Sequence, residues 1–120
     1  IQMHKLYKEI KRMILAFGYS FEGLKAALSE CAFCLEVLVS IIAIPLAFFI
    51  ANNPAELALL ISSLFLVMIM ELLNTAVETA INRISLEIHP LSKKAKDIAS
   101  AAVLLSIINA AIIWSVVLWS

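Results

Sequence analysis

The distribution of charge along this chain is the feature that most constrains how it can fold. Residues 37–55 and 98–120 carry no charged side chain, and residues 57–70 form another uncharged apolar stretch. A bilayer core of about 30 Å is crossed by about 20 helical residues. The first and last stretches are therefore each long enough to span a membrane once. The middle stretch also spans if its helix runs from about residue 54 to about residue 83, through Glu71 and Glu78.

Composition supports a membrane protein over a water-soluble one. Of the 120 residues 63% are hydrophobic and only 15% are charged, whereas a soluble domain is nearer half apolar and a quarter charged. A chain of this length cannot hide that much apolar surface from water. We predict a single all-α membrane domain, residues 1–120, with transmembrane helices at about 31–51, 54–83 and 96–119. Nine basic and nine acidic residues cancel, so we expect no nucleic-acid partner.

Residues 5–30 have a different pattern, with apolar side chains at intervals of three and four and charged side chains largely elsewhere. That spacing gives a helix one apolar face, and the lysines among its charges favour a helix lying in the membrane interface. Basic residues precede the first span and lie between the second and third, while residues 52–54 have none. The positive-inside rule therefore predicts a cytoplasmic N-terminus. We expect no cleavable signal peptide in residues 1–30.

The middle span carries an unusual row of polar residues, Glu71, Asn74, Glu78 and Asn82. Their spacing of three, four and four residues places them on one face of a helix. An ionisable residue within a bilayer is costly and marks a functional site by default. Asn74 alone could instead serve to join helices by hydrogen bonds. Other polar residues are expected at the same depth: Arg12, Tyr19, Glu30, Glu36, His89, Lys96 and Asp97.

This combination of groups suits phosphoryl transfer. Carboxylates can hold magnesium, cations can hold phosphates, and a buried carboxylate can take a proton from a hydroxyl. Glycine-rich phosphate loops of the known nucleotide folds are absent from the sequence. Cys31 and Cys34 form a CxxC pair, but a zinc site would need two further ligands at matching spacing, and we expect reduced, buried thiols there.

Several segments resemble the bacterial integral-membrane diacylglycerol kinase family, in its Gram-negative form. The segments are GYSFEGLKAA at 18–27, ECAFCLE at 30–36, ELLNTAVE at 71–78, NRI at 82–84, HPLS at 89–92 and KAKDIASAAV at 94–103. The resemblance implies a homotrimer in the inner membrane with active sites shared between subunits on the cytoplasmic side. It also implies transfer of the γ-phosphoryl group of Mg-ATP to the primary hydroxyl of sn-1,2-diacylglycerol, giving phosphatidic acid and ADP.

Roles for individual residues also come from the resemblance. Glu71 would be the general base and Asn74 an active-site amide, while Glu30 and Glu78 would bind Mg²⁺. The positions expected to contact the nucleotide are Arg12, Tyr19, Glu30, Glu78, Glu87, His89, Lys96 and Asp97. The positions expected to contact the lipid are Arg12, Ala16, Phe21, Lys25, Leu28, Ala32, Glu36, Glu71, Ser100 and Trp114. Two positions depart from the family pattern, since Asn82 stands where Asp is frequent and Cys34 replaces a commonly basic residue.

Three alternatives remain open from the sequence. Undecaprenol kinase shares the fold and would differ only in its lipid substrate. A small multidrug transporter has a similar length and a membrane glutamate, but it needs four spans and a carboxylate at the midplane, whereas three spans and interfacial acids are predicted here. A non-catalytic membrane scaffold would leave the Glu71–Glu78 row unexplained. Magnesium-dependent ATP turnover separates the kinases from the other two.

Overall fold

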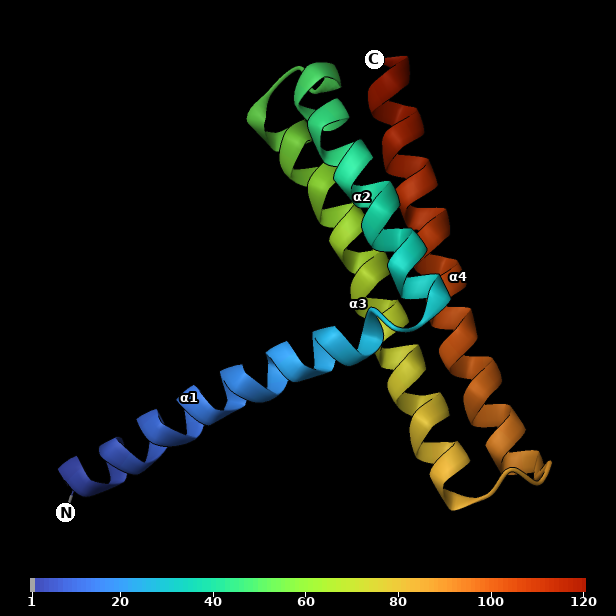
Figure 1. Ribbon diagram of the computed structural model, residues 1–120. Coiled ribbons are helices and arrows are strands. Elements are labelled where there is room, and N and C mark those ends of the chain that lie inside the picture. Colours follow the sequence, from blue (N-terminus) through green and yellow to red (C-terminus); the bar gives the residue numbers. More distant parts are fainter. Residues whose placement is uncertain (1) are drawn as a thin grey trace.

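The computed structural model describes residues 2–120, which form four α-helices (Figure 1). Their bounds in chain order are α1 (Gln2–Ala27), α2 (Cys31–Ile50), α3 (Pro54–Ile84) and α4 (Pro90–Trp119). The last three are long and apolar enough to cross a membrane. The all-helical prediction with three spanning segments is therefore confirmed, and the chain is a multi-pass membrane protein.

Helix α3 is the centre of the bundle, because it packs along both α4 and α2. The best-buried cluster lies towards the end of the bundle where α2 turns into α3 and where α4 finishes. It consists of Ala47, Leu60 and Val117, with Trp114 packed against it. Trp114 Nε1 also donates a hydrogen bond to Ser63 Oγ at 3.2 Å, which fixes the relative position of α3 and α4.

The starts of α3 and α4 are set by local capping. Asn53 precedes α3, and its Oδ1 accepts a hydrogen bond from the backbone N–H of Glu56 at 2.9 Å. His89 does the same for α4, since its Nδ1 accepts from the backbone N–H of Leu91 at 3.1 Å. Each capping residue is followed by a proline, whose missing N–H costs nothing at the first helical position. Helix α4 therefore starts at Pro90, before the spanning segment expected from about residue 96.

Helix α1 points away from the bundle and is joined to it only at its C-terminal end (Figure 1). Ala27 is its one buried residue within the described range. It covers residues 2–27, slightly earlier than the expected 5–30, because Ser29 and Glu30 close a turn by hydrogen bonds to the carbonyls of Ala26 and Ala27. That turn brings the start of α2 against α3.

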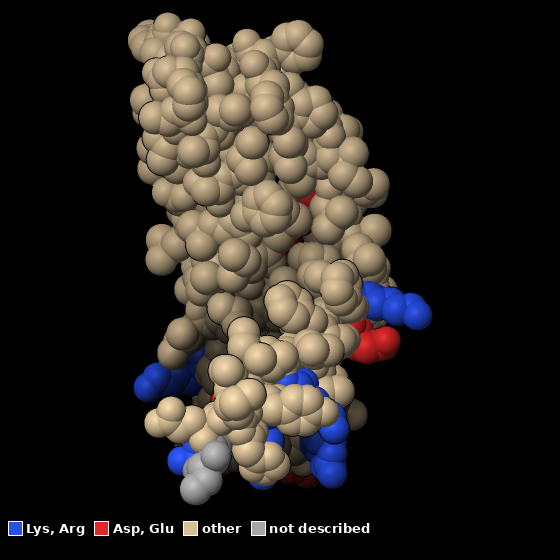
Figure 2. Space-filling view, turned by 90° about the vertical axis from the view of Figure 1, so that its left-hand side faces the viewer, with Lys and Arg blue, Asp and Glu red and all other residues tan. Residues whose placement is uncertain are grey.

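The hairpin of α3 and α4 extends beyond the point where α1 joins α2 (Figure 1). With 31 residues, α3 is about 46 Å long at about 1.5 Å per residue, which exceeds the hydrocarbon thickness of about 30 Å. Figure 2 shows the charged side chains of one face gathered towards one end of the molecule, with a long uncharged region beyond them. The charged side chains visible on this face therefore lie outside the long uncharged region (Figure 2).

Candidate active site

The polar row on α3 passes from a buried position to an exposed one. Glu71 is 8% exposed and is the only charged residue among the buried residues of the described chain. Asn74 is half-buried, and Glu78 and Asn82 are exposed. Since Glu78 follows Glu71 by seven residues, the two carboxylates are about 10 Å apart along the helix axis. The row thus connects the interior of the bundle with its polar end.

A second carboxylate approaches Glu71 from α2. Glu36 lines a pocket together with Leu64 and Val67 of α3, about one to two turns of that helix before Glu71. Within residues 2–120, Glu36 Oε2 is buried and lacks a hydrogen-bond partner. A buried polar atom without a partner carries a substantial free-energy cost. A hydroxyl group placed between these carboxylates would supply the missing donor.

Asn74 lies between Glu71 and Glu78 on α3. One of the two polar atoms of its amide has a hydrogen-bond partner and the other has none. Its Nδ2 donates a hydrogen bond to Glu78 Oε1 at 3.3 Å. Its Oδ1 is buried and has no partner among the described residues. The amide therefore orients Glu78 and leaves a carbonyl oxygen for a donor or a cation.

The end of α1 and the adjacent face of α3 enclose a pocket of about 700 Å³. Glu30 lines it together with a set of hydroxyl-bearing side chains that the sequence reasoning missed: Ser20, Ser29, Thr75 and Thr79. Thr75, Ala76 and Thr79 recur at helical spacing beside the acidic row, and that stripe of small residues is the signal that could have revealed the pocket. The pocket brings Glu30 to the same stretch of α3 as Glu78.

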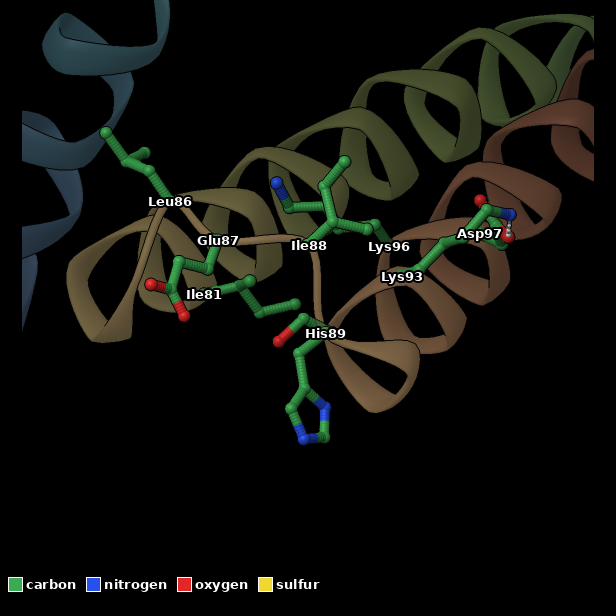
Figure 3. A pocket seen from close by; sticks show the side chains of 9 residues that line it. Ile81, Leu86, Glu87, Ile88, His89, Lys93, Lys96 and Asp97 are labelled. Atoms are coloured by element: carbon green, nitrogen blue, oxygen red, sulfur yellow. Dashed lines mark hydrogen bonds and ion pairs between the residues drawn. The ribbon is translucent and has the colours of Figure 1, made fainter.

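A second pocket, of about 260 Å³, lies where the loop between α3 and α4 meets the first turns of α4 (Figure 3). The residues lining it are Ile81, Leu86, Glu87, Ile88, His89, Ser92, Lys93, Lys96 and Asp97. Lys93 Nζ is 2.7 Å from Asp97 Oδ2, and Lys96 Nζ donates to Asn82 Oδ1 at 2.8 Å. Asn82 is uncharged, so it gives Lys96 a hydrogen-bond acceptor without placing a compensating negative charge beside the ammonium group.

One chain brings some of the expected nucleotide contacts together but not all of them. Glu87, His89, Lys96 and Asp97 share the loop pocket. Arg12 and Tyr19 lie on the projecting α1, where Arg12 pairs with Glu9 at 3.4 Å and Tyr19 is 72% exposed.

The acidic groups of one chain form no complete metal site. Among residues 2–120, no three His, Cys, Asp or Glu side chains are arranged to hold a metal ion. Cys31 and Cys34 are both free thiols, but Cys31 is exposed and Cys34 is half-buried in the single chain, so the prediction that both are buried is wrong. Glu30 and Glu78 could still supply two oxygen ligands for a cation whose other ligands come from a bound molecule.

The expected lipid contacts lie on α1, in the α1–α2 turn and on α2, except for Glu71 on α3 and two residues on α4. Ala16, Phe21, Lys25, Leu28 and Ala32 are exposed. Ser100 is exposed on α4. Trp114, by contrast, is 14 residues further along α4, about 21 Å from Ser100, and packs against the buried cluster near the far end of the bundle.

Comparison with known proteins identifies the family. The sequence model of prokaryotic diacylglycerol kinase matches residues 18–118. This chain belongs to that family. A diacylglycerol kinase of Escherichia coli (strain K12) is 47% identical over 110 residues, covering 91% of this chain and 90% of the relative. Diacylglycerol kinases of Pseudomonas aeruginosa and Helicobacter pylori (strain 26695) are each 43% identical, over 91% and 89% of this chain and 89% and 84% of the relatives.

Membership of this family makes the chain a kinase, as the resemblance in its sequence implied. The family match covers the α3 row and every residue lining the loop pocket and the pocket beside α1. The transporter and scaffold alternatives are therefore excluded.

Proposed function

We propose that this chain transfers the γ-phosphoryl group of Mg-ATP to the primary hydroxyl of sn-1,2-diacylglycerol, giving phosphatidic acid and ADP. The observation that carries the proposal is the α3 row, in which a buried carboxylate, Glu71, lies about 10 Å from an exposed one, Glu78. A lipid hydroxyl can reach the first from the membrane, and a nucleotide can reach the second from water. The names of the relatives support the lipid substrate.

In this mechanism Glu71 is the general base. The hydroxyl oxygen of diacylglycerol attacks the γ-phosphorus, its proton passes to a carboxylate oxygen of Glu71, and the bond between the γ-phosphorus and the bridging oxygen breaks to release ADP. The unpaired Glu36 Oε2 accepts a hydrogen bond from the incoming lipid headgroup. Asn74 holds Glu78 by its Nδ2 and leaves its Oδ1 facing the site.

The residues present fit magnesium. Glu30, Glu78 and Asn74 Oδ1 offer hard oxygen ligands, and magnesium in nucleotide sites is held by one or two carboxylates together with phosphates. The absence of a larger acidic cluster in the described residues is compatible with that number of ligands. When bound, magnesium neutralises the charge that develops on the phosphate oxygens.

The scattered nucleotide residues favour a homotrimer with shared active sites. Glu87, His89, Lys96 and Asp97 gather at the loop pocket, whereas Arg12 and Tyr19 project on α1. In an assembly, α1 of one subunit completes the loop pocket of its neighbour. Cations on both elements then hold the triphosphate.

The arrangement in the membrane follows from the charges. We place α1 as an amphipathic helix on the cytoplasmic surface of the bacterial inner membrane, with Ala16, Phe21 and Leu28 against the lipid and Lys25 near the headgroups. The charged end of the α3–α4 hairpin is then cytoplasmic. Ala32 and Ser100 line the entry of the lipid from the bilayer.

The test is phosphate transfer from γ-labelled Mg-ATP, with dioctanoylglycerol and undecaprenol offered side by side to the purified protein. We expect labelled phosphatidic acid. Glu71→Gln should lower kcat by about 10²- to 10⁴-fold, the usual contribution of a general base, while ATP binding stays within about twofold.

Glu56→Gln is the matched control, because it makes the same change in the first turn of α3, away from the polar row. Near-normal turnover in Glu71→Gln would remove Glu71 from the mechanism. Labelling of undecaprenol in preference to diacylglycerol would keep the mechanism and reassign the substrate.

A further inference from the structure

Asn109 is a polar side chain in the middle of the apolar part of α4. It lies 12 residues after Asp97 and 11 before Ser120, which is about 18 Å and about 16 Å along the helix axis. With a hydrocarbon thickness of about 30 Å, Asn109 is near the bilayer midplane. Its side chain is too short to reach either interface.

The described part of the chain gives this amide no hydrogen-bond partner. The neighbouring polar groups of α4 are bonded elsewhere, since Ser106 Oγ donates to the Val103 carbonyl and Trp114 Nε1 donates to Ser63. Asn109 is half-buried in a groove of about 390 Å³ along α3 and α4. The other residues lining this groove are Leu66, Met70, Ala102, Leu105 and Ser106.

The groove is open on the side of α3 and α4 that α2 leaves free. Helix α2 lies on the opposite side, where its residues enclose another apolar pocket with Ile107 and Ala110 of α4. No α2 residue lines the Asn109 groove. Ala102 and Ser106 are small, and small residues allow a further helix to approach closely in a membrane.

The midplane position decides what can occupy the groove. Lipid tails cannot bond an amide, and headgroups are about 15 Å away, half the hydrocarbon thickness. A protein helix with a polar group at the same depth satisfies both the apolar groove and the amide. Every copy of this chain carries such a group in Asn109 itself.

We infer that the Asn109 groove is an interface at which a second copy of this chain packs, with the Asn109 amide hydrogen-bonding across the contact. This inference rests on the proposed homotrimer and names the surface that forms it. The interface contains no catalytic group, so assembly can be measured directly, without a turnover assay.

A single substitution tests the inference, because the two possibilities predict changes in assembly strength of opposite direction. Asn109→Leu removes the amide and keeps a similar volume. If Asn109 bonds across the interface, the substitution weakens assembly, by about 3- to 18-fold in the dissociation constant for each interhelical bond of the strength measured in membrane proteins. If Asn109 faces lipid without a partner, the same substitution removes a polar group from hydrocarbon and leaves assembly unchanged or strengthened.

The measurement is the oligomeric state of the full chain in detergent micelles over a dilution series, by light scattering coupled to size exclusion. We expect wild type and Asn109→Gln to remain assembled at concentrations at which Asn109→Leu dissociates. Ser106→Ala is the matched control, because that hydroxyl is already bonded within its own helix. Helical circular dichroism checks that each variant is folded.

The outcomes separate this inference from the proposed function. If Asn109→Leu dissociates at the same protein concentration as wild type, or only at a lower one, the proposed interface is overturned. A wild-type chain that is monomeric but phosphorylates diacylglycerol also overturns the interface and leaves the proposed chemistry standing. A wild-type oligomer that Asn109→Leu weakens, without lipid kinase activity, supports the interface and counts against the proposed function alone.

Discussion

Lys96 Nζ and Asn82 Oδ1 are 2.8 Å apart, and their hydrogen bond joins the last turns of α3 to the first turns of α4. Asn82 is the fourth member of the polar row on α3, and Lys96 lines the loop pocket. The bond therefore connects the two parts of the proposed site. It holds Lys96 by a neutral acceptor, while the neighbouring Lys93 is paired with Asp97.

We predict that Asn82→Ala raises the KM for Mg-ATP by about three- to tenfold, because a hydrogen bond to a charged group contributes about 1.5–3 kcal/mol and part of that loss falls on nucleotide binding. The kcat should change less, since the bond positions Lys96 for binding. Steady-state kinetics with saturating dioctanoylglycerol provides the measurement.

Asn82→Gln is the matched control for this effect, because it keeps a neutral amide. It keeps the acceptor oxygen, so the KM for Mg-ATP should stay within about twofold of wild type, a difference below about 0.4 kcal/mol. A wild-type KM in Asn82→Ala would show that Lys96 needs no acceptor on α3.

The magnesium ligands lead to a second prediction. Glu78→Gln keeps the size of the side chain and its ability to bond Asn74, but removes one of the two carboxylates proposed to hold the metal. The Mg²⁺ concentration for half-maximal activity should rise by about tenfold or more, within the range of about 10- to 100-fold seen when metal-site residues are altered. A magnesium titration at fixed ATP measures this shift.

Glu22→Gln is the control, because Glu22 is exposed on α1, and this variant should leave the magnesium titration unchanged. An unshifted curve for Glu78→Gln would exclude Glu78 as a ligand.

The cap of α3 gives a prediction about stability alone. Asn53→Ala removes the side-chain acceptor for the Glu56 N–H and should lower the free energy of unfolding by about 1 kcal/mol, the usual value of an N-cap. Asn53→Asp keeps the acceptor and should recover most of the loss. Because position 53 is about 27 Å along α3 from Glu71, the kcat of the folded fraction should not change. Unfolding in mixed micelles followed by circular dichroism tests the first point, and a kcat that falls with stability would contradict the second.

The sequence predicted the spanning helices well, because an uncharged stretch of bilayer length has few other solutions. Hydropathy predicts only the spanning part of α4, from about residue 96, whereas the His89 cap and the proline after it start the helix at Pro90. The order Glu71, Asn74, Glu78 and Asn82 on one face was also readable, since it depends only on helical periodicity.

What the sequence could not provide is the register between helices. The approach of Glu36 to Glu71 depends on how far α2 slides along α3, and periodicity within one helix does not determine that offset. The hydroxyl-lined pocket beside Glu30 depends in the same way on the turn at Ser29, which sets the direction of α1. Both features arise from tertiary packing, where side-chain volume and close-packing decide the outcome.

The hydrogen bond between Trp114 and Ser63 gives the last prediction. Ser63 is 1% exposed, and its hydroxyl also donates to the Leu60 carbonyl at 2.7 Å, so the oxygen is oriented to accept from the indole N–H. Trp114→Phe and Ser63→Ala should each lower the free energy of unfolding, and the double variant should lose less than their sum. The coupling energy should be about 0.6–1.7 kcal/mol, as for interhelical hydrogen bonds in membranes.

A double-mutant cycle by equilibrium unfolding in micelles measures this coupling. Ser62→Ala is the matched control, because Ser62 is exposed and donates to the Leu59 carbonyl of its own helix, so its cycle with Trp114→Phe should give no coupling. Additive effects of Trp114→Phe and Ser63→Ala would mean that the bond contributes nothing to holding α3 against α4, and that Trp114 stabilises the bundle by its buried ring alone.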